Sequence, residues 1–244
     1  MYSFLLIGQS NMAGRGKIDE VEPINNNRLY ILRNGRWQNM FVPINPDRAF
    51  SGISLAESFA DSVSKYYGAD IGLIPCADGG TTLEHWKKDD LLYTNALYQA
   101  KLAMRTSEIA GVLWHQGESD CADGKYQIYK EKCTEIFEAL RSDLGLNDQP
   151  FLVGGLGSFL ANFDDNGKNY PFVNSALKEM EKENDYIGYV SADGLTANPD
   201  NLHFNAKSLR EFGTRYFEKF KGMNKIITKN SEKFDANLSS MELL

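Results

Sequence analysis

Residues 1–16 read MYSFLLIGQSNMAGRG, and this stretch predicts how the fold begins. The apolar run 2–7 is long enough for a buried strand and too short for most helices. It ends at Gly8 and is followed by three polar residues, Gln9, Ser10 and Asn11. Ligands bind at the carboxyl ends of the strands in open α/β sheets. The stretch therefore predicts that Ser10 lies where such a sheet binds its ligand.

Ser10 itself has two interpretations. Taken alone, such a serine is more often a turn residue or a helix N-cap than a nucleophile. A nucleophile would stand near the N-terminus of the following helix, whose N–H groups favour negative charge. This second interpretation requires partner residues from later in the chain.

The length and composition fit a single α/β domain. The chain has 244 residues, and 42% of them are hydrophobic, which is enough for a large core. The net charge of −7 argues against nucleic acid and anionic membrane surfaces as partners. We predict one domain over residues 1–221 and a polar, partly ordered C-terminal tail over residues 222–244.

The cysteines bear on cofactors and on the cellular compartment. Cys76, Cys121 and Cys133 form no Cys-x-x-Cys pair and no metal-ligand spacing with a histidine, so we expect no metal and no cofactor. Their odd number suits a reducing compartment. The sequence shows no signal peptide and no apolar run of membrane-spanning length. We expect a cytoplasmic protein, or a secreted one if an export signal has been removed.

Strand and helix patterns alternate along the chain. Apolar strands are predicted at 2–7, 71–75, 109–114, 151–154 and 186–191, and helices at 55–67, 91–106, 125–144, 171–182 and 205–220. Asn34-Gly35 predicts a small hairpin between 28–32 and 36–40. The polar segment 158–169 is interpreted as a surface insertion. This alternation predicts a parallel sheet of about five strands with helices on both faces.

A general base would have to be one of three histidines, His85, His115 and His203. Asp200 precedes His203 by three residues, so its carboxylate can hold one ring nitrogen while the other faces a nucleophile. The alternative is that His203 caps the last helix. We expect His115, directly after a strand, to line the site, and His85 to be packed or to line the substrate.

Two stretches offer donors for an oxyanion. Gly79 and Gly80 leave their backbone N–H groups open to close approach, and Gln116 places a side-chain amide at a strand end. Removing one such donor typically costs about two to three decades in rate. A glycine turn and a strand-terminal glutamine are the alternatives, and only their joint occurrence after successive strands favours a site for acyl transfer.

Four blocks now occur in order along the chain: Gly8–Met12 (GQSNM), Gly79–Thr81 (GGT), His115–Ser119 (HQGES) and Asp200–His203 (DNLH). Together they resemble the four blocks of the SGNH-hydrolase superfamily. More narrowly, they resemble the sialate O-acetylesterase and acetylxylan esterase group, carbohydrate esterase family 6. A glutamine stands in the third block where most of the superfamily has Gly-x-Asn, which matches the narrower group.

The resemblance implies roles for the residues of the blocks. Ser10 would be the nucleophile, His203 the base and Asp200 the residue that orients it. The oxyanion donors would be Ser10 N–H, Gly79 or Gly80 N–H, and Gln116. Glu118 is a supporting residue or an alternative triad acid. The residues expected to line the substrate are Gln9, His115 and Trp86.

The sequence and the resemblance together predict a flavodoxin-like α/β/α domain and a serine esterase that deacetylates a carbohydrate. The substrate is an acetylated small molecule or oligosaccharide, such as acetylxylan or acetylated sialic acid. The sugar and the oligomeric state stay open. One alternative is a lipase-like or thioesterase-like hydrolase for longer acyl groups. The other is a non-catalytic carbohydrate-binding module that stacks sugars on Trp86 and Trp114.

Overall fold

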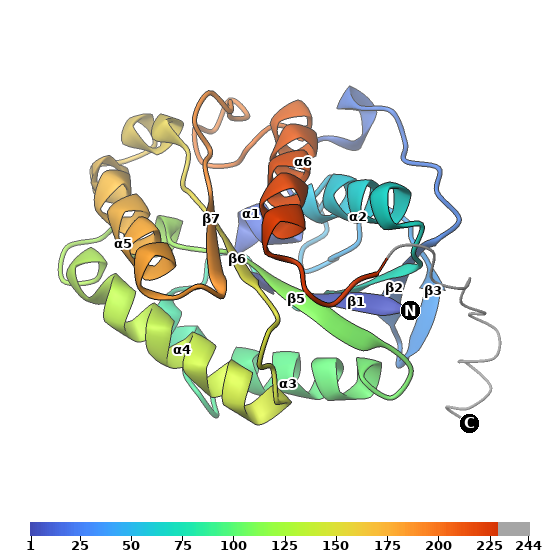
Figure 1. Cartoon of the computed structure of the whole chain (residues 1–244). Helices are drawn as coiled ribbons and strands as arrows, with labels where there is room; N and C mark the ends of the chain where they lie inside the picture. Colours follow the sequence, from blue (N-terminus) through green and yellow to red (C-terminus); the bar gives the residue numbers. More distant parts are fainter. Residues whose placement is uncertain (229–244) are drawn as a thin grey trace.

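The structure, a computed structural model, describes residues 1–228. It is a three-layer α/β/α arrangement around a seven-stranded sheet with the order β3-β2-β4-β1-β5-β6-β7 (Figure 1). All neighbouring strands are parallel except β3, which pairs antiparallel with β2. The strands are β1 (Tyr2–Gly8), β2 (Leu29–Arg33), β3 (Arg36–Asn39), β4 (Ile71–Pro75), β5 (Glu108–His115), β6 (Phe151–Gly154) and β7 (Ile187–Val190). The predicted flavodoxin-like fold class is confirmed.

The sheet is larger than the five strands predicted. All five are present, and the hairpin adds two more because β2 pairs in parallel with β4. The side chains from Leu29 to Leu32 are buried, so the hairpin is part of the core and not a surface feature. A β-hairpin alone buries too little to be stable, which is the physical reason for this docking.

Helices cover both faces of the sheet. The α-helices are α1 (Ser10–Ala13), α2 (Leu55–Tyr67), α3 (Leu91–Ala103), α4 (Tyr129–Leu144), α5 (Tyr170–Glu183) and α6 (Ala206–Met223). Short 3₁₀ helices are η1 (Ile18–Glu20), η2 (Leu83–Trp86), η3 (Glu118–Asp120), η4 (Tyr126–Ile128), η5 (Ser158–Asn162) and η6 (Asn166–Asn169). Helices α2 and α6 pack on one face, and α3, α4 and α5 pack on the other (Figure 1).

The helix boundaries follow local signals. Helix α2 begins with a capping box, in which the Ser54 side chain accepts from Ala56 N–H and Glu57 accepts from Ser54 N–H, and it ends at Gly68. Helix α3 ends earlier than predicted, since residues 104–107 form a turn. Helix α4 begins four residues later than predicted, because η4 precedes it.

The C-terminal prediction falls partly outside the described residues. Helix α6 extends to Met223, and Ile227 is buried against the core, although both positions belong to the predicted tail 222–244. The rest of that tail, residues 229–244, lies outside the described part of the chain. Within residues 1–228, none of the helices has the length and apolar character needed to cross a membrane.

The fold brings four loops to one edge of the sheet. Strand β1 lies between β4 and β5, so the segments after these three strands are neighbours at their carboxyl ends. Glycine at position 8 lets the end of β1 lie against the end of β5. Its φ is 129°, and a Cβ there would lie 2.1 Å from the His115 carbonyl oxygen. The loop before α6 completes this edge, since Phe204 N–H donates to Asn11 Oδ1.

Candidate active site

Ser10, His203 and Asp200 form a hydrogen-bonded row. His203 Nε2 lies 3.0 Å from Ser10 Oγ, and His203 Nδ1 lies 2.7 Å from Asp200 Oδ2. Ser10 is the first residue of α1, with Gln9 at the N-cap position, so it is not the capping residue. The cap of α6 is Asn205 and not His203. The geometry therefore argues against Ser10 as a helix N-cap and against His203 as the cap of the last helix.

Asp200 is held in place by the turn that carries His203. Its Oδ1 accepts from the backbone N–H groups of Leu202 and His203, at 2.9 and 3.0 Å. Burial alone would raise the pKa of Asp200, but these two bonds and the one to the His203 ring outweigh it and lower the pKa. An ionised carboxylate on Nδ1 fixes the ring with Nε2 towards Ser10.

Asn11 fixes the His203 turn to the first loop, a role that sequence reasoning missed. Its Oδ1 accepts from Phe204 N–H at 3.0 Å, and its Nδ2 donates to the Leu202 carbonyl at 3.2 Å. These two groups flank His203 on either side. Asn11 follows the serine directly in the GQSNM block, and this position is the only signal for it in the sequence.

Asp200 hydrogen-bonds directly to the His203 ring, whereas Glu118 hydrogen-bonds to Asn11. Its Oε1 accepts from Asn11 Nδ2 and lies 3.2 Å from His115 Nε2, and its side chain is 2% exposed. Burial would raise the pKa of Glu118, but His115 and Asn11 outweigh it, so the pKa is lowered. Glu118 therefore contacts the residue that anchors the His203 turn, and no contact joins it to His203 itself.

The glycine loop after β4 offers one open N–H beside Ser10. Gly79 N–H is used, since it donates to Asp47 Oδ2 at 2.9 Å. Gly80 N–H has no acceptor among residues 1–228. A Cβ at Gly79 would lie 2.6 Å from Arg15 Nη2 and 3.4 Å from Ser10 Cβ, so the backbone approaches the serine closely only without a side chain.

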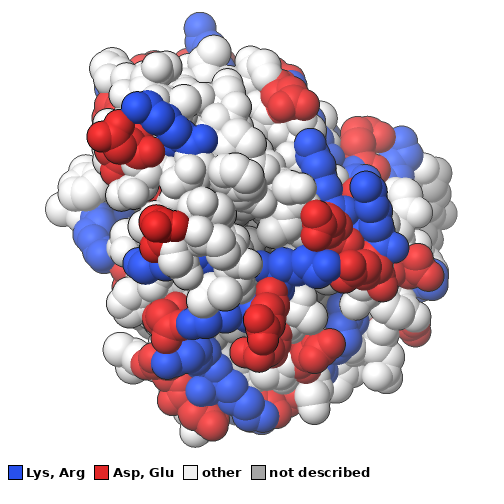
Figure 2. Space-filling model, turned by 90° about the vertical axis from the view of Figure 1, so that its left-hand side faces the viewer, with Lys and Arg blue, Asp and Glu red and all other residues white. Residues whose placement is uncertain are grey.

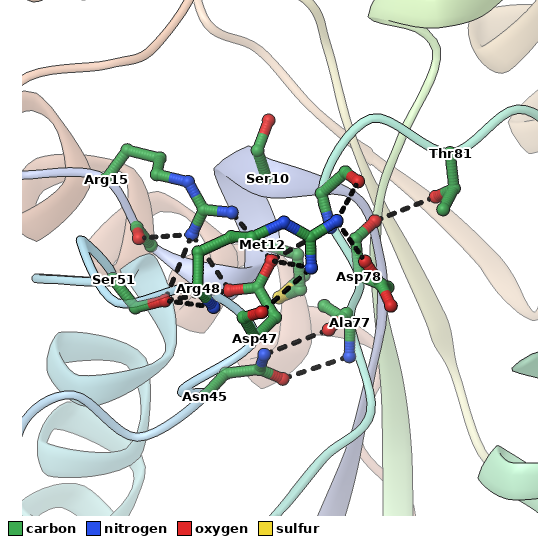
Figure 3. A network of polar contacts seen from close by, with 12 residues as sticks. Ser10, Met12, Arg15, Asn45, Asp47, Arg48, Ser51, Ala77, Asp78 and Thr81 are labelled. Atoms are coloured by element: carbon green, nitrogen blue, oxygen red, sulfur yellow. Dashed lines mark hydrogen bonds and ion pairs between the residues drawn. The ribbon is translucent and has the colours of Figure 1, made fainter.

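A buried ion pair supports this loop (Figure 3). Arg15 donates to both carboxylate oxygens of Asp47, at 3.0 and 2.6 Å, and both side chains are 5% exposed. Burial would raise the pKa of Asp47, but hydrogen bonds from Arg15, Gly79 and Ser51 lower it. This pair joins the segments after β1 and before α2 to the glycine loop. Sequence reasoning missed it, because its members are separated along the chain and carry no motif.

The amide of Gln116 is not directed at the pocket as predicted. The side chain is fully buried, and its Nε2 donates to the Thr81 carbonyl at 3.1 Å and to Asp120. Gln9 is the glutamine that lines the pocket. Its Oε1 accepts from Gly117 N–H and Gln116 Nε2, whereas its own Nε2 has no acceptor among the described residues. The open side-chain amide at this edge thus belongs to Gln9.

Three further predicted positions differ in the structure. Trp86, expected to line the substrate, is fully buried with its Nε1 donating to Thr81 Oγ1 at 3.2 Å. His115 is also fully buried, and its contacts are with Glu118 and the rings of Phe204 and Phe212. His85 is exposed and caps η2. Trp114 is buried against Trp86, so neither tryptophan can stack on a sugar at the surface.

A pocket of about 580 Å³ is lined by Ser10 and His203, whereas Asp200 lies behind His203 and does not line it. Its lining combines the serine and the histidine with both glycines, two phenylalanines and a mixed set of charges: Gln9, Ser10, Arg15, Arg48, Phe50, Gly79, Gly80, Glu118, Ser119, Ala122, Lys125, Phe163, Asp164, Asn166, Leu202 and His203. Figure 2 shows the side of the molecule at the left of Figure 1, where acidic and basic side chains are interspersed. Among residues 1–228, no cluster of three or more His, Cys, Asp or Glu could hold a metal ion.

A family model matches most of the chain, and one protein and two solved structures are similar to it over most of its length. Residues 1–222 match the family described as "Carbohydrate esterase, sialic acid-specific acetylesterase". A probable carbohydrate esterase of Arabidopsis thaliana is 29% identical over an alignment of 233 positions, and the match covers 86% of this chain and 86% of that protein. A solved Arabidopsis thaliana structure superposes with a TM-score of 0.82 and 27% identity, covering 91% of this chain and 98% of that one. The structure of NanS gives a TM-score of 0.68 at 19% identity, covering 91% and 96%, which shows the fold alone.

Proposed function

This chain belongs to the carbohydrate esterase family of sialic acid-specific acetylesterases, and we propose that it is a serine esterase that removes O-acetyl groups from carbohydrates. The observation that carries the proposal is the placement of His203 between Ser10 and Asp200 at the pocket. A serine hydroxyl is a weak nucleophile unless a base takes its proton, and this arrangement supplies an oriented base.

The reaction proceeds through an acetyl-enzyme. His203 Nε2 takes the proton of Ser10 Oγ as the oxygen attacks the ester carbonyl carbon. When the tetrahedral intermediate collapses, His203 gives that proton to the sugar oxygen, and the ester C–O bond breaks. His203 then takes a proton from water, which attacks the acetyl carbon. The second collapse returns the proton to Ser10 Oγ and releases acetate.

We assign the stabilisation of the developing oxyanion to three donors of residues that line the pocket. They are the N–H groups of Ser10 and Gly80, neither of which has an acceptor within residues 1–228, and the side-chain amide of Gln9. Donors that are fixed before the reaction stabilise the charge without a cost for reorientation. In this proposal Gln9 takes the place that the sequence assigned to Gln116.

Replacing Gln9 tests this assignment. Gln9→Leu should lower kcat on 4-nitrophenyl acetate by about 10²- to 10³-fold, the usual effect of losing one oxyanion donor. Gln116→Leu is the matched variant. It should reduce thermal stability more than kcat, because the Gln116 amide bonds to the Thr81 carbonyl, Asp120 and Gln9 Oε1 and does not itself line the pocket. A larger loss of kcat in folded Gln116→Leu than in Gln9→Leu would return the role to Gln116.

The acyl group should be small. The aliphatic residues that line the pocket are Ala122 and Leu202, and the rest of its lining is glycine, polar or aromatic, so the lining offers too few aliphatic side chains for a tunnel that buries a long acyl chain. A tunnel would contribute about 0.8 kcal/mol for each buried methylene, or roughly fourfold in specificity for each carbon. We expect kcat/KM for 4-nitrophenyl esters to fall steeply from acetate to octanoate. A flat or rising series would support the lipase-like alternative instead.

A further inference from the structure

Two exposed phenylalanines border the pocket that contains Ser10. Phe50 is 70% exposed and Phe163 is 46% exposed, and both line that pocket. Exposed apolar side chains are common singly, but two rings at the mouth of one pocket indicate a binding surface. Neither ring has a role in the proposed chemistry at Ser10.

The segment that carries Phe163 is ordered and packed against the His203 loop. It was predicted to be a surface insertion, yet Leu160 is 1% exposed and the Phe159 ring lies 4.9 Å edge-on from the Phe204 ring. Phe163 follows η5 directly, and its N–H donates to the Leu160 carbonyl. Phe163 is therefore carried by a segment that is packed against the loop of His203, and its own side chain lines the pocket.

The turn that carries Phe50 is equally well anchored. The Ser51 hydroxyl bonds to Asp47 Oδ1 and accepts from Arg48 N–H, at 2.8 and 3.1 Å. The Arg15 guanidinium lies 5.3 Å from the centre of the Phe50 ring. Asp47 and Arg15 also hold the glycine loop, so the turn of Phe50 is fixed to another segment of the same pocket.

The position of the leaving alcohol indicates which part of the substrate these two rings contact. In the proposed reaction His203 protonates the oxygen of the departing alcohol, so that alcohol must lie beside His203, in the pocket that Phe50 and Phe163 also line. A pyranose has apolar C–H faces that can cover an aromatic ring and hydroxyls at its edge. Exposed polar side chains, Lys125, Asp164 and Asn166, line the same pocket and can bond to those hydroxyls.

We propose that Phe50 and Phe163 form the carbohydrate subsite, with a pyranose ring of the acetylated substrate packed on them. This inference rests on the proposed function and adds to it the residues that select the alcohol. The tryptophans expected to stack sugars are buried, and these phenylalanines are the aromatic residues that line the pocket in the described part of the chain.

The test compares two acetate esters that share the acyl group. Wild type, Phe50→Ala and Phe163→Ala are assayed with an acetylated methyl xylopyranoside and with ethyl acetate, and the ratio of the two kcat/KM values is the readout. Each alanine should lower this ratio about tenfold through a higher KM for the pyranoside, since each removes one of the two rings on which the sugar packs. Phe163→Tyr should keep the ratio near that of wild type, whereas Phe163→Leu should not.

The matched control is Phe172→Ala. Phe172 is 55% exposed, stacks on Tyr126 and lies outside the pocket lining, so its loss should leave the ratio unchanged. An unchanged ratio in both pocket variants, or an equal loss for both esters, overturns the subsite.

If wild type hydrolyses neither ester, the proposed function fails separately. Binding of the pyranoside, followed by NMR titration, then decides: weaker binding to both alanine variants supports the subsite, and equal binding overturns it.

Discussion

Ser10→Ala should reduce turnover of 4-nitrophenyl acetate by about four to six orders of magnitude, as expected when a triad nucleophile is removed. Within residues 1–228, the Ser10 hydroxyl is the nucleophile that hydrogen-bonds to His203 Nε2, so without it His203 has no proton to take from a side chain at the pocket. The side-chain hydrogen bond of Ser10 is the one to His203, so thermal unfolding should be almost unchanged.

The matched control for this prediction is Ser62→Ala. Ser62 lies on α2, away from the pocket lining, and its removal should leave turnover at the wild-type level. Both variants are purified in parallel, so that a contaminating esterase would appear equally in each. If Ser10→Ala keeps a substantial share of wild-type turnover in a preparation free of such contamination, Ser10 is not the nucleophile.

The second large effect separates Asp200 from Glu118. Asp200→Asn keeps the shape of the side chain but removes the charge that holds the His203 ring, and a comparable triad change costs about 10⁴ in turnover. Glu118→Gln should cost much less turnover, because Glu118 acts on His203 only through Asn11. It should cost more stability instead, since His115 and Asn11 lose a buried charged partner.

Turnover and urea unfolding are measured on both variants. Expressing turnover per folded molecule keeps a loss of structure from being counted as a loss of chemistry. A larger fall in turnover for Glu118→Gln than for Asp200→Asn, with both proteins folded, would make Glu118 the triad acid and Asp200 a loop residue.

Much of the fold could be predicted because it depends on local signals. Apolar runs such as 2–7 and 109–114 end at glycine or polar residues, and the strands form where those runs occur. The capping box at Ser54 likewise begins α2 at the predicted residue. The proximity of Ser10 and His203 could be anticipated as well, since loops at the carboxyl ends of parallel strands share one edge.

The direction of a side chain could not be predicted in this way. Gln9 and Gln116 are both amides at strand ends, and the sequence does not reveal which one faces the pocket. Asp120 and the Thr81 carbonyl decide it, because they hold Gln116 inward. Trp86 is similar: packing against Trp114 buries a side chain that the sequence placed at the surface.

Two features beside the pocket could not be predicted from composition. The insertion 158–169 is rich in Gly, Asn and Asp, which is typical of a surface loop, yet Leu160 anchors it beside the pocket. The pair of Arg15 and Asp47 is separated by 32 positions, so only the folded chain reveals that it supports the glycine loop. Long-range contacts of this kind leave no periodic pattern.

Release of acetate from acetylated carbohydrates tests the central claim most directly. Acetylated xylan and acetylated sialic acid are incubated with wild type and with Ser10→Ala, and free acetate is followed by proton NMR. We predict that wild type releases acetate from at least one of these carbohydrates faster than from ethyl acetate, and that Ser10→Ala releases none above background. Hydrolysis of ethyl acetate with no acetate from either carbohydrate, or equal release by both proteins, would contradict the account.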